Sequence, residues 1–170
     1  EKALILPKDI EWHFIGHLQT NKIKMVVPYV TLIHSIDTLK LLLEIENYSL
    51  KNGYQPDVLL EAYIATEESK QGFTCEELLE LIPTLEELKC VKVKGLMAMA
   101  SFTEDEDQIR KEFAHFNEIF DKMASSGSNA LNDFTIKSFG MTNDYHIAVE
   151  MGSNMVRIGT KIFGARGVRL

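Results

Sequence analysis

Two short segments near the carboxyl end combine glycine with threonine in the arrangement of an anion-binding site. Gly140-Met141-Thr142 follows an apolar stretch at residues 134–139, and Gly159-Thr160 follows another at 155–158. Glycine lets backbone N–H groups approach a ligand closely, and a helix that begins near Thr142 or Asn143 would direct its free N–H groups toward the same anion. Either segment alone is more typical of an ordinary turn or cap. Because this pairing of glycine with threonine occurs twice around one short helix, a phosphate site and a structural role become equal alternatives.

The overall composition restricts the class of protein. The chain has 170 residues, of which 45% are hydrophobic, and 18 basic against 25 acidic side chains give a formal net charge of −7. This is enough apolar sequence for one globular domain over residues 1–170, and the acidic balance argues against a nucleic-acid or anionic-membrane partner. The apolar stretch at 25–36 is interrupted by Pro28 and His34, and the amino terminus lacks the pattern of a signal peptide. We therefore expect a cytoplasmic protein with no membrane partner.

Sequence motifs for metals and nucleotides are absent. Cys75 and Cys90 are the only cysteines, and the five histidines show no spacing typical of zinc ligands. The sequence also contains neither a Gly-x-x-x-x-Gly-Lys-Ser/Thr loop nor a Gly-x-Gly-x-x-Gly fingerprint. We therefore predict no metal site, and we expect both cysteines to be small apolar residues in a reducing compartment.

Hydrophobic periodicity predicts strands that alternate with helices. The predicted strands are residues 10–15, 31–36, 58–64, 91–97, 134–139 and 155–158. A first helix is expected near Thr20 or Asn21 with a break near Pro28, and longer helices are expected at 38–52, from 75 with a kink or an end at Pro83, and at 104–124. Thr74 and Glu77 have the spacing of a capping box, and Gly53 supplies a left-handed stop.

This alternation predicts a parallel sheet whose ligand site lies at the carboxyl ends of the strands. Six strands fit either an open doubly wound sheet or part of a (β/α) barrel. In (β/α)8 barrels, the loops after the last two strands often build a phosphate site, and Thr142 and Thr160 follow the last two strands here. His13 and His34 fall within predicted strands, where a hydrogen-bonded core histidine is the first expectation.

Several longer motifs resemble one known family. The chain contains Trp12-His13-Phe14-Ile15-Gly16-His17-Leu18-Gln19-Thr20-Asn21-Lys22 near its start and Val156-Arg157-Ile158-Gly159-Thr160 followed by Ile162-Phe163-Gly164-Ala165-Arg166 near its end. It also contains Ser69-Lys70-Gln71-Gly72 and Gly95-Leu96-Met97 between them. In this order the motifs resemble the YggS/PROSC family of pyridoxal phosphate homeostasis proteins, and the resemblance covers essentially the whole chain.

The resemblance implies an α/β fold of the (β/α)8 TIM-barrel type, similar to the amino-terminal domain of alanine racemase. This chain would supply only barrel strands three to eight with their helices. Because a typical barrel takes about 250 residues, the resemblance also implies a domain that is incomplete at its amino-terminal side. The strands around His13 and Val156 would then be edges of the sheet.

The resemblance also implies a cofactor and its ligands. The family holds pyridoxal 5'-phosphate as a Schiff base on a lysine in a motif resembling Ala-Val-Ser-Lys, and no such motif occurs in these 170 residues. Thr142 matches the serine of the family's phosphate motif, and Gly159 and Thr160 match further phosphate ligands. Gly140 and Met141 belong to the same cofactor-binding segment as Thr142.

Arg157 matches the family's arginine that faces the pyridine nitrogen of the cofactor. An arginine there keeps this nitrogen unprotonated and weakens the ring as an electron sink. The alternative for Arg157 is a strand residue paired with a carboxylate. His13 and Lys70 complete the candidate cofactor-binding set. Lys70 follows a strand in a Ser-Lys-x-Gly setting and could contact the phosphate or accept the cofactor transiently, although a solvated loop lysine is an equal alternative.

These implications predict a protein that binds pyridoxal phosphate and hands it on, with no residue in a catalytic role. Its partners would be the cofactor and pyridoxal-phosphate-dependent apoenzymes, and it would be a monomer or a weak dimer. One alternative is a vestigial amino-acid racemase-like enzyme that uses another lysine such as Lys70. Another is an incomplete barrel that binds nothing. Related racemases carry a carboxyl-terminal β domain with a catalytic tyrosine, and we expect no such domain here, since the sequence continues for only four residues after Arg166.

Overall fold

The computed structural model describes residues 2–65 and 71–164, which form six strands and the helices that connect them. The strands are β1 (His13–Phe14), β2 (Leu32–Ile36), β3 (Asp57–Glu61), β4 (Lys92–Met97), β5 (Ile136–Met141) and β6 (Met155–Arg157). The α-helices are α1 (Lys2–Ile5), α2 (Ile23–Val26), α3 (Leu39–Asn52), α4 (Cys75–Glu87), α5 (Glu106–Ala124), α6 (Tyr145–Glu150) and α7 (Thr160–Phe163). Three 3-10 helices are η1 (Thr20–Lys22), η2 (Val27–Tyr29) and η3 (Asn129–Leu131).

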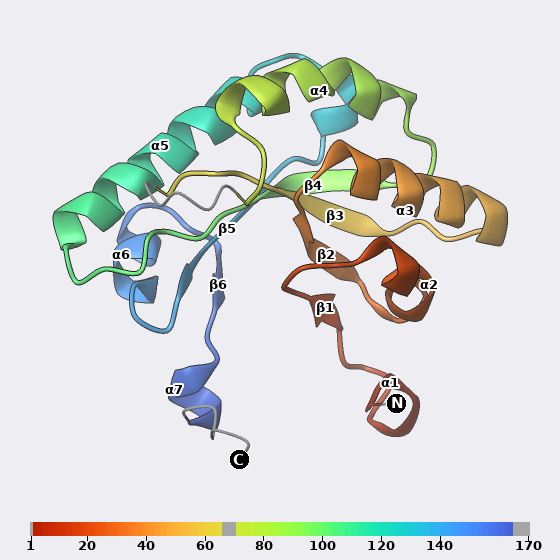
Figure 1. Cartoon of the computed structure of the whole chain (residues 1–170), viewed down its shortest axis with the longest axis horizontal. Coiled ribbons are helices and arrows are strands. Elements are labelled where there is room, and N and C mark those ends of the chain that lie inside the picture. The colour runs from red at the N-terminus through yellow and green to blue at the C-terminus, as the bar shows by residue number, and fades with distance from the viewer. Residues whose placement is uncertain (1, 66–70, 165–170) are drawn as a thin grey trace.

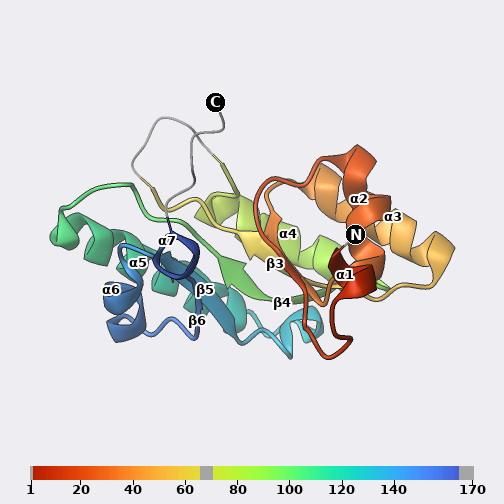
Figure 2. The same ribbon diagram turned by 90° about the horizontal axis from the view of Figure 1, so that it is seen from below.

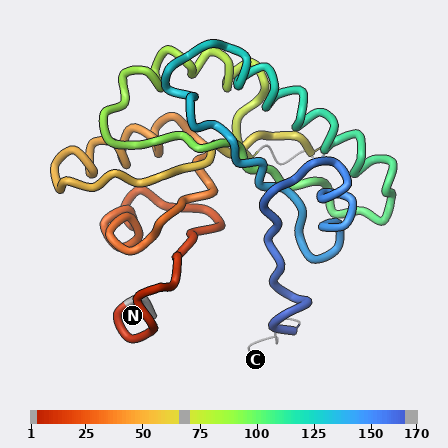
Figure 3. Tube along the Cα trace, turned by 180° about the vertical axis from the view of Figure 1, so that it is seen from behind, coloured from red at the N-terminus to blue at the C-terminus, as the bar shows by residue number. Residues whose placement is uncertain are grey.

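The sheet is parallel throughout, and its strand order follows the sequence from β1 to β6. Figure 1 shows the sheet curled into an arch, with α3, α4 and α5 over its convex side. The views in Figures 2 and 3 show the concave side open between β1 and β6, with α1 and α7 beyond these two strands. A strand order without reversal and a strong curl are features of a (β/α) barrel, here represented by six of its strands. The barrel prediction is confirmed, and the doubly wound alternative is wrong.

The two ends of the sheet are edges in the part of the chain that the structure describes. β1 pairs only with β2, and β6 pairs only with β5. This confirms the predicted edges. The first strand is nevertheless shorter than the predicted residues 10–15, because only His13 and Phe14 find ladder partners, at Leu32 and Ile33.

The predicted helix boundaries are confirmed where capping signals are present. The Thr38 side chain accepts a hydrogen bond from the Leu41 backbone N–H at 3.2 Å, and Gly53 ends α3 with φ of 74°. Thr74 and Glu77 form both hydrogen bonds of a capping box at the start of α4. In α5, the Asp105 carboxylate accepts hydrogen bonds from the first-turn N–H groups.

Two predictions about proline have different outcomes. The predicted break near Pro28 is confirmed, since α2 ends at Val26 and a 3-10 helix follows. The helix does not end at Pro83, since α4 continues to Glu87. An interior proline costs about 3 kcal/mol, and burial of the apolar face of α4 against the core offsets this cost. That face consists of Leu78, Leu81 and Leu85.

The sheet carries a hydrophobic cluster on each face. The larger cluster fills the space between the convex face and the helices, where Phe139 of β5 packs against Phe113 and Phe116 of α5 at centroid distances of 4.6 Å. The smaller cluster contains Leu32, Leu59 and Met97, with Ile136 and Met155 packed against it. Since Val58 and Leu60 belong to the convex cluster, alternation of side chains along β3 places the smaller cluster on the concave face. Among the described helices, none has the length and apolar character required to cross a membrane.

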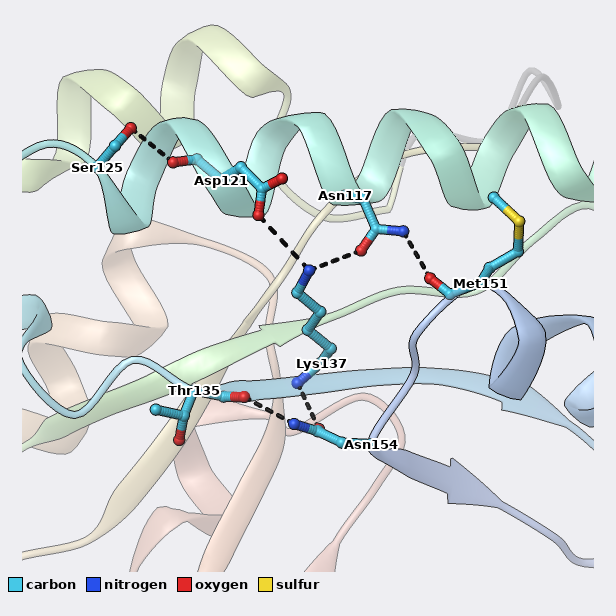
Figure 4. A network of polar contacts seen from close by, with 7 residues as sticks. All are labelled: Asn117, Asp121, Ser125, Thr135, Lys137, Met151 and Asn154. Carbon is cyan, nitrogen blue, oxygen red and sulfur yellow. Dashed lines mark hydrogen bonds and ion pairs between the residues drawn. The ribbon is translucent and has the colours of Figure 1, made fainter.

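A polar network joins the last two strands to α5 (Figure 4). The Lys137 ammonium group lies 2.9 Å from Asn117 Oδ1 and 3.5 Å from Asp121 Oδ1, and it lies over the Phe120 ring. The Lys137 backbone N–H donates to Asn154 Oδ1 at 2.8 Å, and Asn154 Nδ2 donates to the Thr135 carbonyl at 2.8 Å. Asn154 therefore links the segment before β6 to β5, which fixes the relative position of the two strands that carry the predicted phosphate site.

We expect Asn154→Ala to lower the free energy of unfolding by about 1 kcal/mol, because two backbone groups lose their side-chain partner, at a position exposed to water. Asn132→Ala is the matched control, since Asn132 is exposed beyond η3. Chemical denaturation of both variants measures the difference. Equal stabilities of the two variants would contradict the proposed role of Asn154.

Candidate functional site

One layer of the concave face is polar. Leu32, Leu59, Ile136 and Met155 form or border the small concave cluster. Side chains two positions apart in a strand point to the same side, so the next concave residues toward the carboxyl ends of the strands are His34, Glu61, Ser138 and Arg157. Barrel interiors are usually filled by branched apolar side chains. A polar layer at the carboxyl ends instead indicates a binding site.

An open cavity of about 920 Å³ lies over this layer. Six of the eight residues predicted for the cofactor lie on its wall, namely His13, Met141, Thr142, Arg157, Gly159 and Thr160. Of the other two, Lys70 lies outside the described residues, and Gly140 is not on the wall. The structure therefore brings together residues from β1, β5 and β6, from the loops after β5 and β6, and from the start of α7.

Gly140 has a packing role in the structure. Its φ is +96°, and a Cβ atom at this position would lie 2.4 Å from Ala148 Cβ and 3.3 Å from Tyr145 Cα. Glycine is therefore needed to let α6 pack closely on the end of β5. This reason differs from the close approach of a ligand that the sequence suggested.

The loop between β5 and α6 also differs from the sequence prediction. β5 extends to Met141 rather than ending at residue 139, and α6 begins at Tyr145 rather than near Thr142 or Asn143. The buried Asp144 carboxylate accepts a hydrogen bond from the Met141 N–H at 2.5 Å. This bond closes the loop and occupies one of the backbone donors that the sequence assigned to an anion.

The two predicted phosphate segments meet through Thr142. Its hydroxyl oxygen accepts a hydrogen bond from the Gly159 N–H at 3.3 Å, so the hydroxyl hydrogen can still be donated to a ligand. A Cβ atom built on Gly159 has no atom within 4 Å, which shows open space beside this backbone. Beyond Thr160, Lys161 Nζ lies 2.9 Å from the Tyr145 hydroxyl and 4.7 Å from the centre of its ring, which ties α7 to α6.

Arg157 is fixed by acceptors on β5 and just beyond the end of β4. Its Nη1 donates to the Ser138 carbonyl at 2.8 Å and to Ser138 Oγ at 2.9 Å, and its Nη2 donates to the Ala98 carbonyl at 2.9 Å. Burial lowers the pKa of Arg157 from its ordinary value, while Glu61 and Asp144 act in the opposite direction. A guanidinium group has five N–H donors, so these three contacts leave donors for a ligand in the cavity. The predicted alternative, direct pairing with a carboxylate, is not among its contacts within the described residues.

The two strand histidines differ in exposure. His34 is buried, and its ring nitrogens lie 3.2 Å from Ser138 Oγ and 3.1 Å from His13 Nδ1. Burial, followed by the positive charges of His13 and Arg157, lowers the pKa of His34 to about 4. The expectation of a hydrogen-bonded core histidine is therefore confirmed for His34. It is wrong for His13, which is exposed because β1 is an edge strand.

Glu61 is a site residue that the sequence reasoning missed. It is 2% exposed and lies on the cavity wall, and its Oε2 atom has no hydrogen-bond partner among residues 2–65 and 71–164. Burial and the nearby Asp37 raise the pKa of Glu61 to about 7, although Arg157 and His17 act in the opposite direction. Its position in the sequence offered a signal, since an acidic residue directly ends the apolar run Val58-Leu59-Leu60. Ser138 offered a similar sequence signal, because it is a small polar residue within β5.

Comparisons with known proteins agree with this geometry. The profile of the alanine racemase N-terminal domain matches residues 3–167. A pyridoxal phosphate homeostasis protein of Aquifex aeolicus is 42% identical over 158 residues, which cover 93% of this chain and 68% of that protein. Another of Helicobacter pylori is 38% identical over 156 residues, covering 91% and 67%. The chain thus spans about two thirds of the length of these relatives.

Solved structures give the same result. PipY of Synechococcus elongatus, solved with PLP bound, is 27% identical with a TM-score of 0.84, and the match covers 96% of this chain and 74% of PipY. A protein of Bifidobacterium adolescentis described as unknown is 35% identical with a TM-score of 0.86, covering 91% and 61%. Alanine racemase of Clostridium difficile has a TM-score of 0.74 at 16% identity, covering 94% and 40%, which is a similarity of fold alone.

Proposed function

This chain belongs to the alanine racemase N-terminal-domain family and, within it, to the pyridoxal phosphate homeostasis proteins, and we propose that it binds pyridoxal 5'-phosphate in the concave cavity. Its role is intracellular homeostasis and carriage of the cofactor without strong catalytic activity. The observation that carries the proposal is the position of Thr142, Gly159 and Arg157 on the wall of one cavity. In the same proposal, the protein is a cytoplasmic monomer or weak dimer that passes the cofactor to apoenzymes.

The donor set fits the two ends of the cofactor. At the phosphate end, the Thr142 and Thr160 hydroxyls and the backbone at Gly159 border open space. At the ring end, Arg157 retains N–H donors that suit a pyridine nitrogen. Bound pyridoxal phosphate supplies an aldehyde that reacts with amines and a ring that withdraws electrons. Because Arg157 is a permanent donor, it favours the unprotonated ring nitrogen, and this supports carriage rather than turnover.

We expect Gly159→Ala and Thr142→Val to weaken binding of pyridoxal phosphate about tenfold. Gly159→Ala should leave the thermal unfolding midpoint unchanged, whereas Thr142→Val also loses the hydrogen bond from the Gly159 N–H and should lower the midpoint slightly. The alanine methyl group enters open space at Gly159 without touching protein atoms, and valine removes one charge-assisted hydrogen bond, worth about 1.5 kcal/mol. Thr135→Val is the matched control, because Thr135 lies just before the amino-terminal end of β5, remote from Thr142. Titration by absorbance or fluorescence gives the Kd values.

Pyridoxal without its phosphate serves as the second ligand in the same titrations. We expect it to bind weakly and equally to all four proteins, because it lacks the group that Thr142 and Gly159 contact. If Thr142→Val and Gly159→Ala bind pyridoxal phosphate as tightly as the parent and Thr135→Val do, the phosphate lies elsewhere. If the folded parent chain binds neither ligand, these 170 residues do not form a cofactor site. This is the result expected for an incomplete barrel that binds nothing.

A further inference from the structure

A chain of hydrogen bonds crosses the concave face from β6 to β1. Arg157 Nη1 lies 2.9 Å from Ser138 Oγ, Ser138 Oγ lies 3.2 Å from His34 Nδ1, and His34 Nε2 lies 3.1 Å from His13 Nδ1. Ser138 and His34 are separated by 104 residues in the sequence and by two strands in the sheet. The curl of the sheet brings them together, and both are buried.

The direction of this chain is set at Arg157. A guanidinium group only donates hydrogen bonds, so Ser138 Oγ accepts from Arg157 and its own hydrogen is available for His34 Nδ1. His34 then accepts at Nδ1, carries its proton at Nε2 and donates to His13 Nδ1. The reverse direction would leave the buried Ser138 hydroxyl hydrogen without an acceptor among its contacts in the described residues. A buried unpaired donor is costly, which favours the first direction.

The environment of His34 agrees with this direction. An imidazole that accepts at Nδ1 and donates at Nε2 must be neutral. Burial is the largest cause that lowers the pKa of His34, to about 4, so the ring is neutral near pH 7. The neutral ring holds the Ser138 hydroxyl hydrogen on its own side and leaves an oxygen lone pair directed toward Arg157.

We propose that Ser138 and His34 are positioning residues for Arg157, with His34 acting through Ser138 to orient the guanidinium group toward a ring nitrogen in the cavity. This inference rests on the proposed function for the ligand, but the orientation of Arg157 is a property of the chain itself. Removal of His34 takes away the acceptor of the Ser138 hydroxyl hydrogen. The hydroxyl can then rotate, and its oxygen lone pair is no longer held toward Arg157, which loosens one of the three bonds that fix the guanidinium plane. The carbonyls of Ser138 and Ala98 remain as its acceptors.

The test measures the part of ligand affinity that depends on the ring nitrogen. Kd values are obtained for pyridoxal phosphate and for its 1-deaza analogue, in which carbon replaces that nitrogen. We expect the parent chain to prefer pyridoxal phosphate about tenfold, His34→Leu to lose this preference, and His34→Asn to keep most of it, because the asparagine amide oxygen can replace the Nδ1 acceptor. The Kd of the deaza analogue should stay the same in all three proteins. Ser138→Ala is a second variant that should also lose the preference.

If His34 had a purely structural role, His34→Leu would bind both ligands more weakly by the same factor, and this result would overturn the proposal. A tenfold preference that is retained in His34→Leu would also overturn it. A ligand-free measurement separates this inference from the proposed function. By ¹⁵N NMR at pH 7 we expect the His34 proton on Nε2 and an Arg157 Nε–H order parameter that falls in His34→Leu but not in His34→Asn. A proton on Nδ1, or an unchanged order parameter, would overturn the positioning role. If the parent binds neither ligand while both NMR results are as expected, the positioning role stands and the proposed cofactor site fails.

Discussion

Glu61→Gln and His34→Asn are expected to change the pH dependence of the free energy of unfolding in opposite directions, each by about 3 kcal/mol over its titration range. Both parent side chains are 2% exposed and lie in the polar layer of the concave face. One is an acid with a raised pKa, and the other is a base with a lowered pKa. A pKa difference of one unit between folded and unfolded states corresponds to about 1.4 kcal/mol.

For Glu61, the pKa rises from 4.5 in the unfolded chain to about 7 in the folded protein. The folded state therefore binds more protons than the unfolded state between these values, and stability decreases as pH rises from 4.5 to 7. Glutamine cannot ionise and removes this decrease. Relative to the parent, Glu61→Gln should gain about 3 kcal/mol of stability on going from pH 4 to pH 8.

For His34, the pKa falls from 6.5 in the unfolded chain to about 4 in the folded protein. Here the unfolded state binds more protons, so stability decreases as pH falls from 6.5 to 4. Asparagine removes this decrease. Relative to the parent, His34→Asn should gain about 3 kcal/mol of stability on going from pH 8 to pH 4, in addition to any constant loss from its altered packing.

In the parent chain the two effects oppose each other across pH 4.5–6.5, so together they contribute almost no slope there. Urea denaturation of the parent, both single variants and the double variant between pH 4 and pH 8 measures the slopes. Differences from the parent isolate the substituted group together with the neighbours that it interacts with, because the other titrating groups cancel. Differences that stay constant with pH in both single variants would show that Glu61 and His34 titrate normally in the folded state.

Local sequence signals predicted most of the fold. The alternation of strands and helices, the Thr74–Glu77 capping box and the glycine after α3 depend on neighbours along the chain, and all appear in the structure. The signal for a phosphate site at the ends of the last two strands also came from neighbouring residues in the sequence. The structure places Thr142 and Gly159 in contact. The start of α6 was wrong, because the Asp144 carboxylate closes a turn after Met141 that no periodicity signals.

The polar layer could not be predicted from local signals, because it depends on the curl of the sheet. His34, Glu61, Ser138 and Arg157 come from four strands spread over more than 120 positions, and they share one face only after the barrel geometry is known. A repeated apolar-x-polar pattern was nevertheless present, as Leu32-x-His34, Leu59-x-Glu61, Ile136-x-Ser138 and Met155-x-Arg157. Read with the period of a strand, this pattern predicts one polar layer in a parallel barrel.

Glu46 is a further position where we expect a large effect, and it too depends on long-range contacts. Its buried carboxylate lies on α3 and accepts hydrogen bonds from three consecutive backbone N–H groups at the entry to β4. The distances are 2.8 Å from Lys89, 3.2 Å from Cys90 to each oxygen, and 2.8 Å from Val91. Since the Ala98 carbonyl just beyond β4 holds Arg157, this anchor also sets the strand that orients the site.

We expect Glu46→Ala to lower the free energy of unfolding by about 3 kcal/mol, because it leaves three N–H groups without their charged acceptor, one of them at the buried Val91. Glu46→Gln should lose about half as much, since an amide oxygen can accept but the adjacent NH₂ group faces backbone donors. Glu44→Ala, exposed on the same helix, is the control and should change stability by less than about 0.5 kcal/mol. Urea denaturation at pH 7 ranks the variants. A Glu46→Ala protein as stable as Glu44→Ala would mean that water replaces the carboxylate without cost, and the α3–β4 anchor would then have no role in holding the strand beside Arg157.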